Sequence, residues 1–314
     1  MLFGMHAKRG KQKRAIPFPP PTDARSIAVL HTLNGRVPPI IFQFCQFVVA
    51  KVGLCAPFDC LELFAGRKAV TRGLRLLGYK AVAVERDDDS SMDFLSPHGF
   101  LQAACLALSL RKRGFLMAAP VCSSWVWLSR SRTGRSHWNP LGRGSCADKG
   151  NTMVARLAVL LRIVHVFDIM WVLEQPQGSL MERHPRIQDL CTSTGVCRSS
   201  WRMGDFGASS QKPTWLYANR SLRSLRFYRV RACSKTCTRL TTCKGTHDGR
   251  RNVQGNKEAL RRSATYPRQF GEALSHVYRM FDTGDFSSCQ PAQSRRWPKD
   301  DWADACLHEC MCSV

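Results

Sequence analysis

Short apolar runs alternate along the chain with longer segments of helical periodicity. Four runs predict strands: FDCLELF (58–64), KAVAVE (80–85), GFLMAAP (114–120) and IMWVLEQ (169–175). Apolar residues at helical spacing between these runs predict helices near 67–78, 97–112 and 148–167. Strands that alternate with helices of this length indicate βαβ units around a mostly parallel sheet. We therefore expect a doubly wound α/β fold.

The remaining segments complete an expected domain over 58–282. A short helix is predicted before Asp189, strands at SSWRM (199–203) and TWLYAN (214–219), and a last helix at YPRQFGEALSHVYRMF (266–281). Outside the domain we expect a basic, proline-rich flexible arm at 1–26, a helical lead-in at 27–57 and a disordered, cysteine-containing tail at 283–314.

The net positive charge of the chain predicts a negatively charged binding partner. The chain has 314 residues, with 47 Lys and Arg against 23 Asp and Glu, a net charge of +24. Such an excess favours a polyanion, and nucleic acid is the first to consider, although a solvated basic surface is the alternative. The segment 220–262 is a basic insert with 13 Lys and Arg against two acids, and Phe227 and Tyr228 lie among its arginines. Phosphate contact with some stacking is its functional interpretation, and a solvated loop is the alternative.

The cysteines and the N-terminus indicate an intracellular protein. Fifteen cysteines are scattered through the chain without a recognisable signal peptide, so we expect mostly reduced thiols. The basic cluster near the N-terminus favours the nucleus, and an organelle remains an alternative. The apolar stretch at 40–57 is interrupted by Gln43, Gln46 and Lys51, so no membrane span is expected.

Three cysteines and a histidine in the basic insert are candidate metal ligands. Cys233, Cys237, Cys243 and His247 resemble zinc ligands, but their spacing matches no standard finger, so no metal is expected.

The ends of the strands carry the candidate chemistry, because ligands of doubly wound sheets bind beyond the carboxyl ends of the strands. Gly66 allows a tight turn after the first strand, and Glu85 follows Glu62 by 23 residues. That offset is close to the roughly 20 residues typical of a carboxylate that holds ribose hydroxyls. A single glycine suits a nucleoside-containing cofactor better than a dinucleotide, and a purely structural turn is the alternative.

Cys122 and Glu174 stand at two further strand ends. Cys122 follows Pro120, where a thiol can be exposed to a ligand, and Arg130, Arg132 and Arg135 downstream would favour its thiolate. Simple packing of a buried cysteine is the alternative. Glu174 suits proton handling or substrate binding, because an unpaired carboxylate is costly to bury.

Several of these residues fall into an ordered set of motifs. ELFAG, Glu85, Asp93, APVCSS, VLEQP, FGASSQKPTWLYAN and YPRQFGEAL together resemble the S-adenosylmethionine-dependent cytosine-C5 DNA methyltransferase family, over residues 58–282. The resemblance implies a Rossmann-like class I methyltransferase fold that binds S-adenosylmethionine and a nucleic acid.

The resemblance also implies residue roles. Phe64 to Gly66 and Glu85 would hold the methionine and ribose of the cofactor and Asp93 its adenine, while Cys122 would add to the pyrimidine and Glu174 would grip its N3 and exocyclic amine. Candidate cofactor contacts are Glu62, Phe64, Ala65, Gly66, Glu85, Asp93 and Pro120. Candidate nucleic-acid contacts are Arg130, Arg132, Gln211, Lys212, Arg226, Arg229 and Arg231.

The chain also departs from the family pattern. The glycine-rich first loop is reduced to Gly66 followed by Arg-Lys-Ala, Val121 precedes Cys122, Gln175 follows Glu174, and Lys212 stands where arginines are usual. The insert at 220–262 is short for a folded target-recognition domain. The sequence thus predicts a cytosine-C5 methyltransferase, with DNA favoured over RNA. A catalytically silent nucleic-acid-binding or scaffold protein of the same fold is the alternative, and the oligomeric state stays open.

Overall fold

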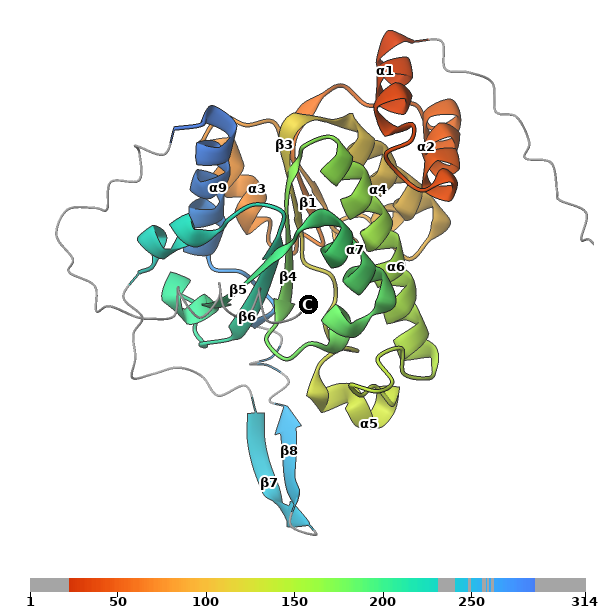
Figure 1. Cartoon of the computed structure of the whole chain (residues 1–314). Coiled ribbons are helices and arrows are strands. Elements are labelled where there is room, and N and C mark those ends of the chain that lie inside the picture. The colour runs from red at the N-terminus through yellow and green to blue at the C-terminus, as the bar shows by residue number, and fades with distance from the viewer. Residues whose placement is uncertain are drawn as a thin grey trace, which may run out of the picture.

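The computed structural model describes residues 23–230, 241–247, 250–255, 258, 260 and 263–285 (Figure 1). Most of the expected N-terminal arm and C-terminal tail lies outside these residues, as do Arg231, Cys233 and Cys237. The hairpin of β7 (Thr241–His247) and β8 (Arg250–Gly255) is described by its backbone. Among the described helices, none has both the length and the apolar character needed to cross a bilayer.

A six-stranded sheet with the order β2-β1-β3-β4-β6-β5 organises the chain. Its first four strands are parallel, and β6 runs antiparallel to both β4 and β5. The strands are β1 (Phe58–Leu63), β2 (Ala81–Val84), β3 (Leu110–Ala118), β4 (Met170–Pro176), β5 (Cys197–Arg202) and β6 (Pro213–Ala218). The predicted fold class, a doubly wound and mostly parallel α/β sheet of the Rossmann-like type, is confirmed.

The register of the sheet brings four strand ends to one edge. Leu63 of β1 is paired with Val84 of β2 and with Ala118 of β3, and Ala118 is paired in turn with Leu173 of β4. The segments that follow these four strands therefore start side by side at the carboxyl edge of the sheet. The strands read as apolar runs in the sequence because both faces of a parallel sheet are buried.

Helices cover both faces of this sheet (Figure 1). One face packs against α4 (Pro97–Ser109), α6 (Ser145–Val166) and α7 (Pro185–Thr194), with α1 (Ala24–Leu33) and α2 (Pro39–Lys51) beyond them. The other face packs against α3 (Ala69–Leu76) and α9 (Arg268–Thr283). Side chains of β4 alternate between the two layers: Trp171 and Leu173 belong to the first core, and Met170 and Val172 to the second.

Helices α3 and α9 cross with almost no side chain between them. A methyl group on Gly73 would lie 2.6 Å from Ser275 Oγ and 2.9 Å from the carbonyl oxygen of Gly271. A methyl group on Gly271 would in turn collide with the backbone of Ala69. Small residues therefore allow the first helix of the sheet domain to pack directly on its last helix.

Two elements differ from the sequence predictions. Strand β3 begins at Leu110 and not at Gly114, because a register shift between Phe58 and Cys60 of β1 lets the polar segment Arg111–Arg113 take part in the strand. Asp189 lies inside α7 and not after a helix, and its carboxylate pairs with Arg162 of α6 at 2.5 Å.

Candidate active site

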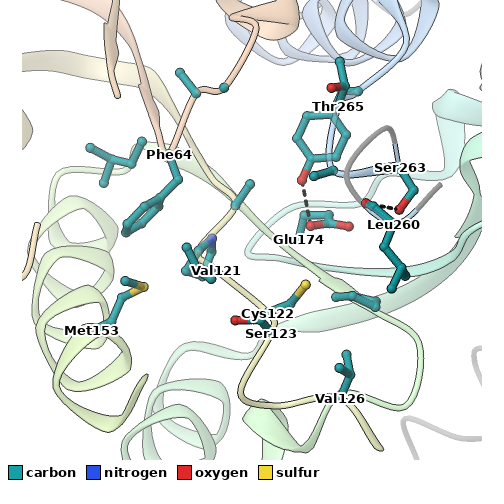
Figure 2. Close-up of a pocket in the computed structure, with 18 of the residues that line it drawn as sticks. Phe64, Val121, Cys122, Ser123, Val126, Met153, Glu174, Leu260, Ser263 and Thr265 are labelled. Carbon is teal, nitrogen blue, oxygen red and sulfur yellow. Dashed lines mark hydrogen bonds between the residues drawn. The ribbon is translucent and has the colours of Figure 1, made fainter. Parts of the chain in front are cut away.

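A cavity of about 1080 Å³ opens at the carboxyl edge of the sheet. The segments after β1, β2, β3 and β4 line it, together with Met153 of α6 and residues 260 and 263–266 ahead of α9. In Figure 2, Phe64 and Met153 lie on one side of the cavity and Glu174 on the other, and the sulfur of Cys122 is directed toward the side of Glu174. Ligands of doubly wound sheets bind at this place.

The turn after β1 has an unusual backbone. Phe64 has φ 58° and Gly66 has φ 50°, so both lie in the left-handed region, which a phenylalanine rarely adopts. Lys212, on the opposite wall, has φ 28°. Strained residues of this kind concentrate at ligand sites, where the surrounding structure holds them in place.

Glu85 and Asp93 place two carboxylates at the β1–β2 side of the cavity. Glu85 Oε2 accepts a hydrogen bond from the amide of Gly66 at 2.7 Å, and Oε1 accepts one from the amide of Asp87 at 3.2 Å. Asp93 accepts a hydrogen bond from the amide of Leu95 through Oδ1 at 2.9 Å. Each carboxylate oxygen has two lone pairs, so acceptor capacity is left for a ligand on both residues.

An aromatic pair belongs to the apolar part of the cavity lining. The rings of Phe64 and Phe94 meet edge to face, with their centroids 5.0 Å apart. Val84 and Met92 line the same part of the cavity. A flat heterocycle can be held between such side chains while its polar atoms reach Glu85 or Asp93.

Cys122 lies in the segment after β3, half-buried and on the cavity wall. Gln175 of β4 donates a hydrogen bond from Nε2 to the carbonyl oxygen of Pro120 at 3.0 Å and accepts one from Ser179 Oγ at 3.0 Å. The carbonyl oxygen of Cys122 itself accepts a hydrogen bond from the amide of Trp125 at 2.9 Å. These bonds fix the cysteine-bearing turn to the neighbouring strand.

The pKa of the Cys122 thiol is raised, first by burial and then by the negative charge of Glu174. Lys212 acts in the opposite direction and lowers this pKa. The sequence-based prediction that Arg130, Arg132 and Arg135 favour the thiolate is wrong, because the cation that lowers this pKa is Lys212. Arg135 is buried against Trp125 instead, with its guanidinium carbon 3.4 Å from the ring centre.

Glu174 is 4% exposed; one carboxylate oxygen accepts a hydrogen bond, and the other is part of an ion pair. Oε2 accepts a hydrogen bond from the hydroxyl of Tyr266 at 2.6 Å. Oε1 lies 3.5 Å from Lys212 Nζ and has no hydrogen-bond donor among the described residues. Because this buried oxygen belongs to a residue that lines the cavity, a ligand with an N–H group can supply the missing bond.

Tyr266 is a partner that sequence reasoning did not assign. Burial raises the pKa of its phenol well above the ordinary value, and the charge of Glu174 raises it further, so the phenol stays a donor. The ring also packs against Lys212, whose Nζ lies 5.3 Å from the ring centre. The only signal in the sequence was the position of Tyr266 as the first residue of YPRQFGEAL.

Glu62 is a candidate cofactor residue that the structure does not bring to the cavity lining. Its Oε2 accepts hydrogen bonds from the amide of Thr71 at 2.7 Å and from the hydroxyl of Thr71 at 2.5 Å, inside the packed interface with α3. Burial raises the pKa of Glu62. The other candidate cofactor residues, Phe64, Ala65, Gly66, Glu85, Asp93 and Pro120, all line the cavity.

The candidate nucleic-acid residues are spread over several places. Arg132 and Lys212 line the cavity, whereas Arg130 and Gln211 do not. Arg226 lies over the ring of Phe227 at 4.9 Å, and Arg229 pairs with Asp205 at 3.6 Å, both away from the cavity lining. Arg231 lies outside the described residues. So do two of the four cysteine and histidine residues considered for zinc, and the described side chains contain no cluster of three or more potential metal ligands.

Comparisons with known proteins add little beyond this geometry. No protein-family model matches the chain, and no curated protein sequence matches it. Among solved structures, the chain is similar to the Dnmt2 methyltransferase of S. pombe, with 13% sequence identity and a TM-score of 0.34. The match covers 59% of this chain and 58% of that one. A functional assignment therefore rests on the cavity and its residues.

Proposed function

We propose that this protein is an S-adenosylmethionine-dependent methyltransferase that acts on C5 of cytosine in nucleic acid. One observation carries the proposal: a single cavity has a nucleoside-type wall at Glu85 and Asp93 on one side and the pair Cys122 and Glu174 on the other. Its volume of about 1080 Å³ is at the upper end of the range for ligand pockets, which suits two ligands that meet.

The residues at the β1–β2 side fit the cofactor. Glu85 has acceptor capacity for ribose hydroxyls and Asp93 for an exocyclic amine, and Phe64 lies in the turn that would hold the methionine and ribose. Arg67, which stands where the family has glycine, lines the cavity and would meet the carboxylate of the methionine part. When bound, the cofactor supplies an electrophilic methyl group on its sulfonium.

The residues on the other side suit a pyrimidine. The thiol of Cys122 would lose its proton and add to the ring carbon next to C5, so that the electron pair moves to C5. Glu174 would accept hydrogen bonds from the exocyclic amine and from a protonated N3 with the oxygen that has no hydrogen-bond donor, while Tyr266 fixes the other oxygen. After methylation, loss of the C5 proton and cleavage of the S–C bond would restore the thiol. The base must leave its stack to reach this pocket.

A smaller cavity of about 270 Å³ supports a nucleic-acid substrate. It shares Arg67, Lys212 and Tyr266 with the larger cavity. Among the described residues, its lining has two cations and five hydroxyl side chains and no carboxylate; the hydroxyls belong to Ser209, Ser210, Ser263, Thr265 and Tyr266. Cations and hydroxyls together suit a backbone phosphate beside the target base.

A catalytically silent nucleic-acid-binding protein is the second candidate, and the raised pKa of Cys122 favours it. A thiol that burial and Glu174 keep protonated at neutral pH is a poor nucleophile until it loses its proton. The two candidates share the same fold and differ in whether Cys122 forms a covalent bond with the base.

Covalent trapping tests the proposal. An oligonucleotide with 5-fluorocytosine, incubated with S-adenosylmethionine, should form an adduct that survives denaturing electrophoresis, because fluorine replaces the proton that must leave. Cys122→Ser should abolish the adduct. Cys197→Ser, at an exposed cysteine in β5, is the matched control and should leave it intact. A wild-type protein that binds cofactor in calorimetry and binds the oligonucleotide but forms no adduct would be the silent form.

A further inference from the structure

A compact loop at residues 133–143 follows the short helix α5 (Arg130–Thr133). Its two ends are joined by a hydrogen bond from the amide of Arg143 to the carbonyl oxygen of Thr133 at 2.6 Å. Inside it, the amide of Ser136 binds the carbonyl oxygen of Asn139 at 3.0 Å. Gly142, with φ 64°, closes the loop where a side chain would collide with Thr133 and lie 2.7 Å from Arg135 Cγ. The loop therefore has one defined shape.

The buried side chain of Arg135 anchors this loop to the rest of the domain. Arg135 is 2% exposed, and its guanidinium stacks on Trp125 and donates hydrogen bonds to the carbonyl oxygen of Ala147 at 2.9 Å and to Asn151 Oδ1 at 3.0 Å. A further bond reaches the carbonyl oxygen of Pro140, inside the loop. One buried side chain thus connects the loop to α6 and to the segment after Cys122.

The rigid loop displays a tryptophan to solvent. Trp138 is 96% exposed, and Trp127, in the 3-10 helix Trp127–Ser129 at the cavity wall, is 52% exposed. Four of the nine exposed large hydrophobic side chains in the described part of the chain lie between 121 and 141: Val121, Trp127, Trp138 and Leu141. So many exposed apolar side chains within one short segment of the chain indicate that this segment takes part in an interaction.

The charge around these side chains indicates the chemistry of the partner. The segment 121–150 contains five Arg and Lys residues but one acidic residue, Asp148. Arg132 and Arg143 are exposed on either side of Trp138 in the sequence, and Arg132 lines the cavity. The backbone of β8 lies beside the helix that carries Trp127. Indole rings interleaved with arginines are typical of surfaces that stack on unpaired bases and neutralise their phosphates.

We propose that Trp138 and Trp127 form a stacking platform for unpaired nucleotides that flank the target base, with Arg132 and Arg143 at their phosphates. The inference rests on the proposed function and specifies its substrate class as an unpaired nucleic-acid strand. An intact duplex hides the faces of its bases, so it offers these rings nothing to stack on. The rigid loop limits the entropy that is lost when Trp138 engages a base.

Anisotropy titrations of a labelled oligonucleotide, single-stranded and in duplex, test this platform. Wild type should bind the single strand more tightly. Trp138→Ala should weaken single-strand binding by about tenfold or more and leave duplex binding unchanged, and Trp138→Phe should keep most of the affinity because a ring remains. Leu76→Ala, at an exposed apolar side chain of α3, is the matched control and should change neither affinity.

Further measurements separate stacking from phosphate contact. Trp138→Ala should keep the salt dependence of wild type, whereas Arg143→Gln should reduce its slope by about one. Abasic sites in the strand should weaken wild type but add little to the loss in Trp138→Ala, because both changes remove the same contact. Equal losses for single strand and duplex, or a changed sedimentation coefficient in Trp138→Ala, would overturn the platform; the latter would identify a second copy as the occupant.

The failure of this inference is distinguishable from that of the proposed function. A protein that binds single strands through Trp138 but forms no 5-fluorocytosine adduct would keep the platform and lose the enzyme. A protein that forms the adduct with unchanged affinity in Trp138→Ala would keep the enzyme and lose the platform.

Discussion

The buried guanidinium of Arg135 offers a sharp test of how the tryptophan loop is held. In Arg135→Met the stem of the side chain is kept, while the charge and its hydrogen bonds are removed. The structure assigns three acceptors to this guanidinium, on Pro140, Ala147 and Asn151, and one aromatic partner, Trp125. All of them lie around a side chain that is 2% exposed, so water cannot readily replace the lost donors.

The expected loss of stability follows from these contacts. A hydrogen bond from a charged donor contributes about 1.5–3 kcal/mol, and neighbouring bonds are not additive, so we expect a total loss of about 4 kcal/mol. For an ordered region of this size, about 2–4 °C in Tm accompany each kcal/mol, which predicts a fall of about 8–16 °C.

Thermal unfolding by circular dichroism measures this fall, and limited proteolysis reports on the loop itself. Arg143→Met is the matched control, because it removes an exposed arginine from the same loop and should leave Tm unchanged. A Tm for Arg135→Met within about 2 °C of wild type, with no new cleavage between 133 and 143, would refute the role of Arg135 as the anchor of the loop.

Two further predictions concern the cavity. Glu174→Gln removes a negative charge that raises the pKa of Cys122. Alkylation of Cys122 by iodoacetamide, followed by peptide mass spectrometry, should then be faster at neutral pH, and the curve of rate against pH should move to lower pH. Lys212→Gln should move the curve to higher pH, and a curve that stays in place in both variants would contradict the charge assignment. Glu85→Ala should weaken S-adenosylmethionine binding about tenfold in calorimetry through the loss of charged hydrogen bonds, with nucleic-acid affinity as the control that should not change.

The two glutamates at strand ends show what the sequence could and could not predict. Apolar runs located the buried part of each central strand, because buried strands have little choice of residue type, but they missed the polar start of β3 at Leu110. Glu62 and Glu174 looked equivalent in the sequence, and both point to the face that α3 and α9 cover. Thr71 of α3 takes up Glu62 within the packed layer, whereas Glu174 lies beyond that layer and reaches the cavity. This difference depends on where each covering helix begins.

Contacts between residues far apart in the sequence could not be predicted from local sequence patterns. Tyr266 binds Glu174 across 92 residues, and Arg135 binds α6 through the backbone carbonyl oxygen of Ala147 and the side-chain oxygen of Asn151. Periodicity and motif spacing describe neighbours along the chain, so the sequence does not predict either contact, although Tyr266 stands first in the motif YPRQFGEAL. The arginines after Cys122 were noticed for their charge, but burial under Trp125 gives Arg135 a structural role.

The direct packing of α3 on α9 also has a consequence for how the protein is made. Ser275 of α9 contacts Val70 of α3 across 205 residues. At ordinary rates of translation, about 10–40 s separate the emergence of the two helices from the ribosome. Through that interval one apolar face of the sheet lacks the cover of α9, and the Glu174 carboxylate has no tyrosine to bind it. Apolar surface that is exposed in this way makes a nascent chain prone to aggregation, and the cavity is completed only when the last helix arrives.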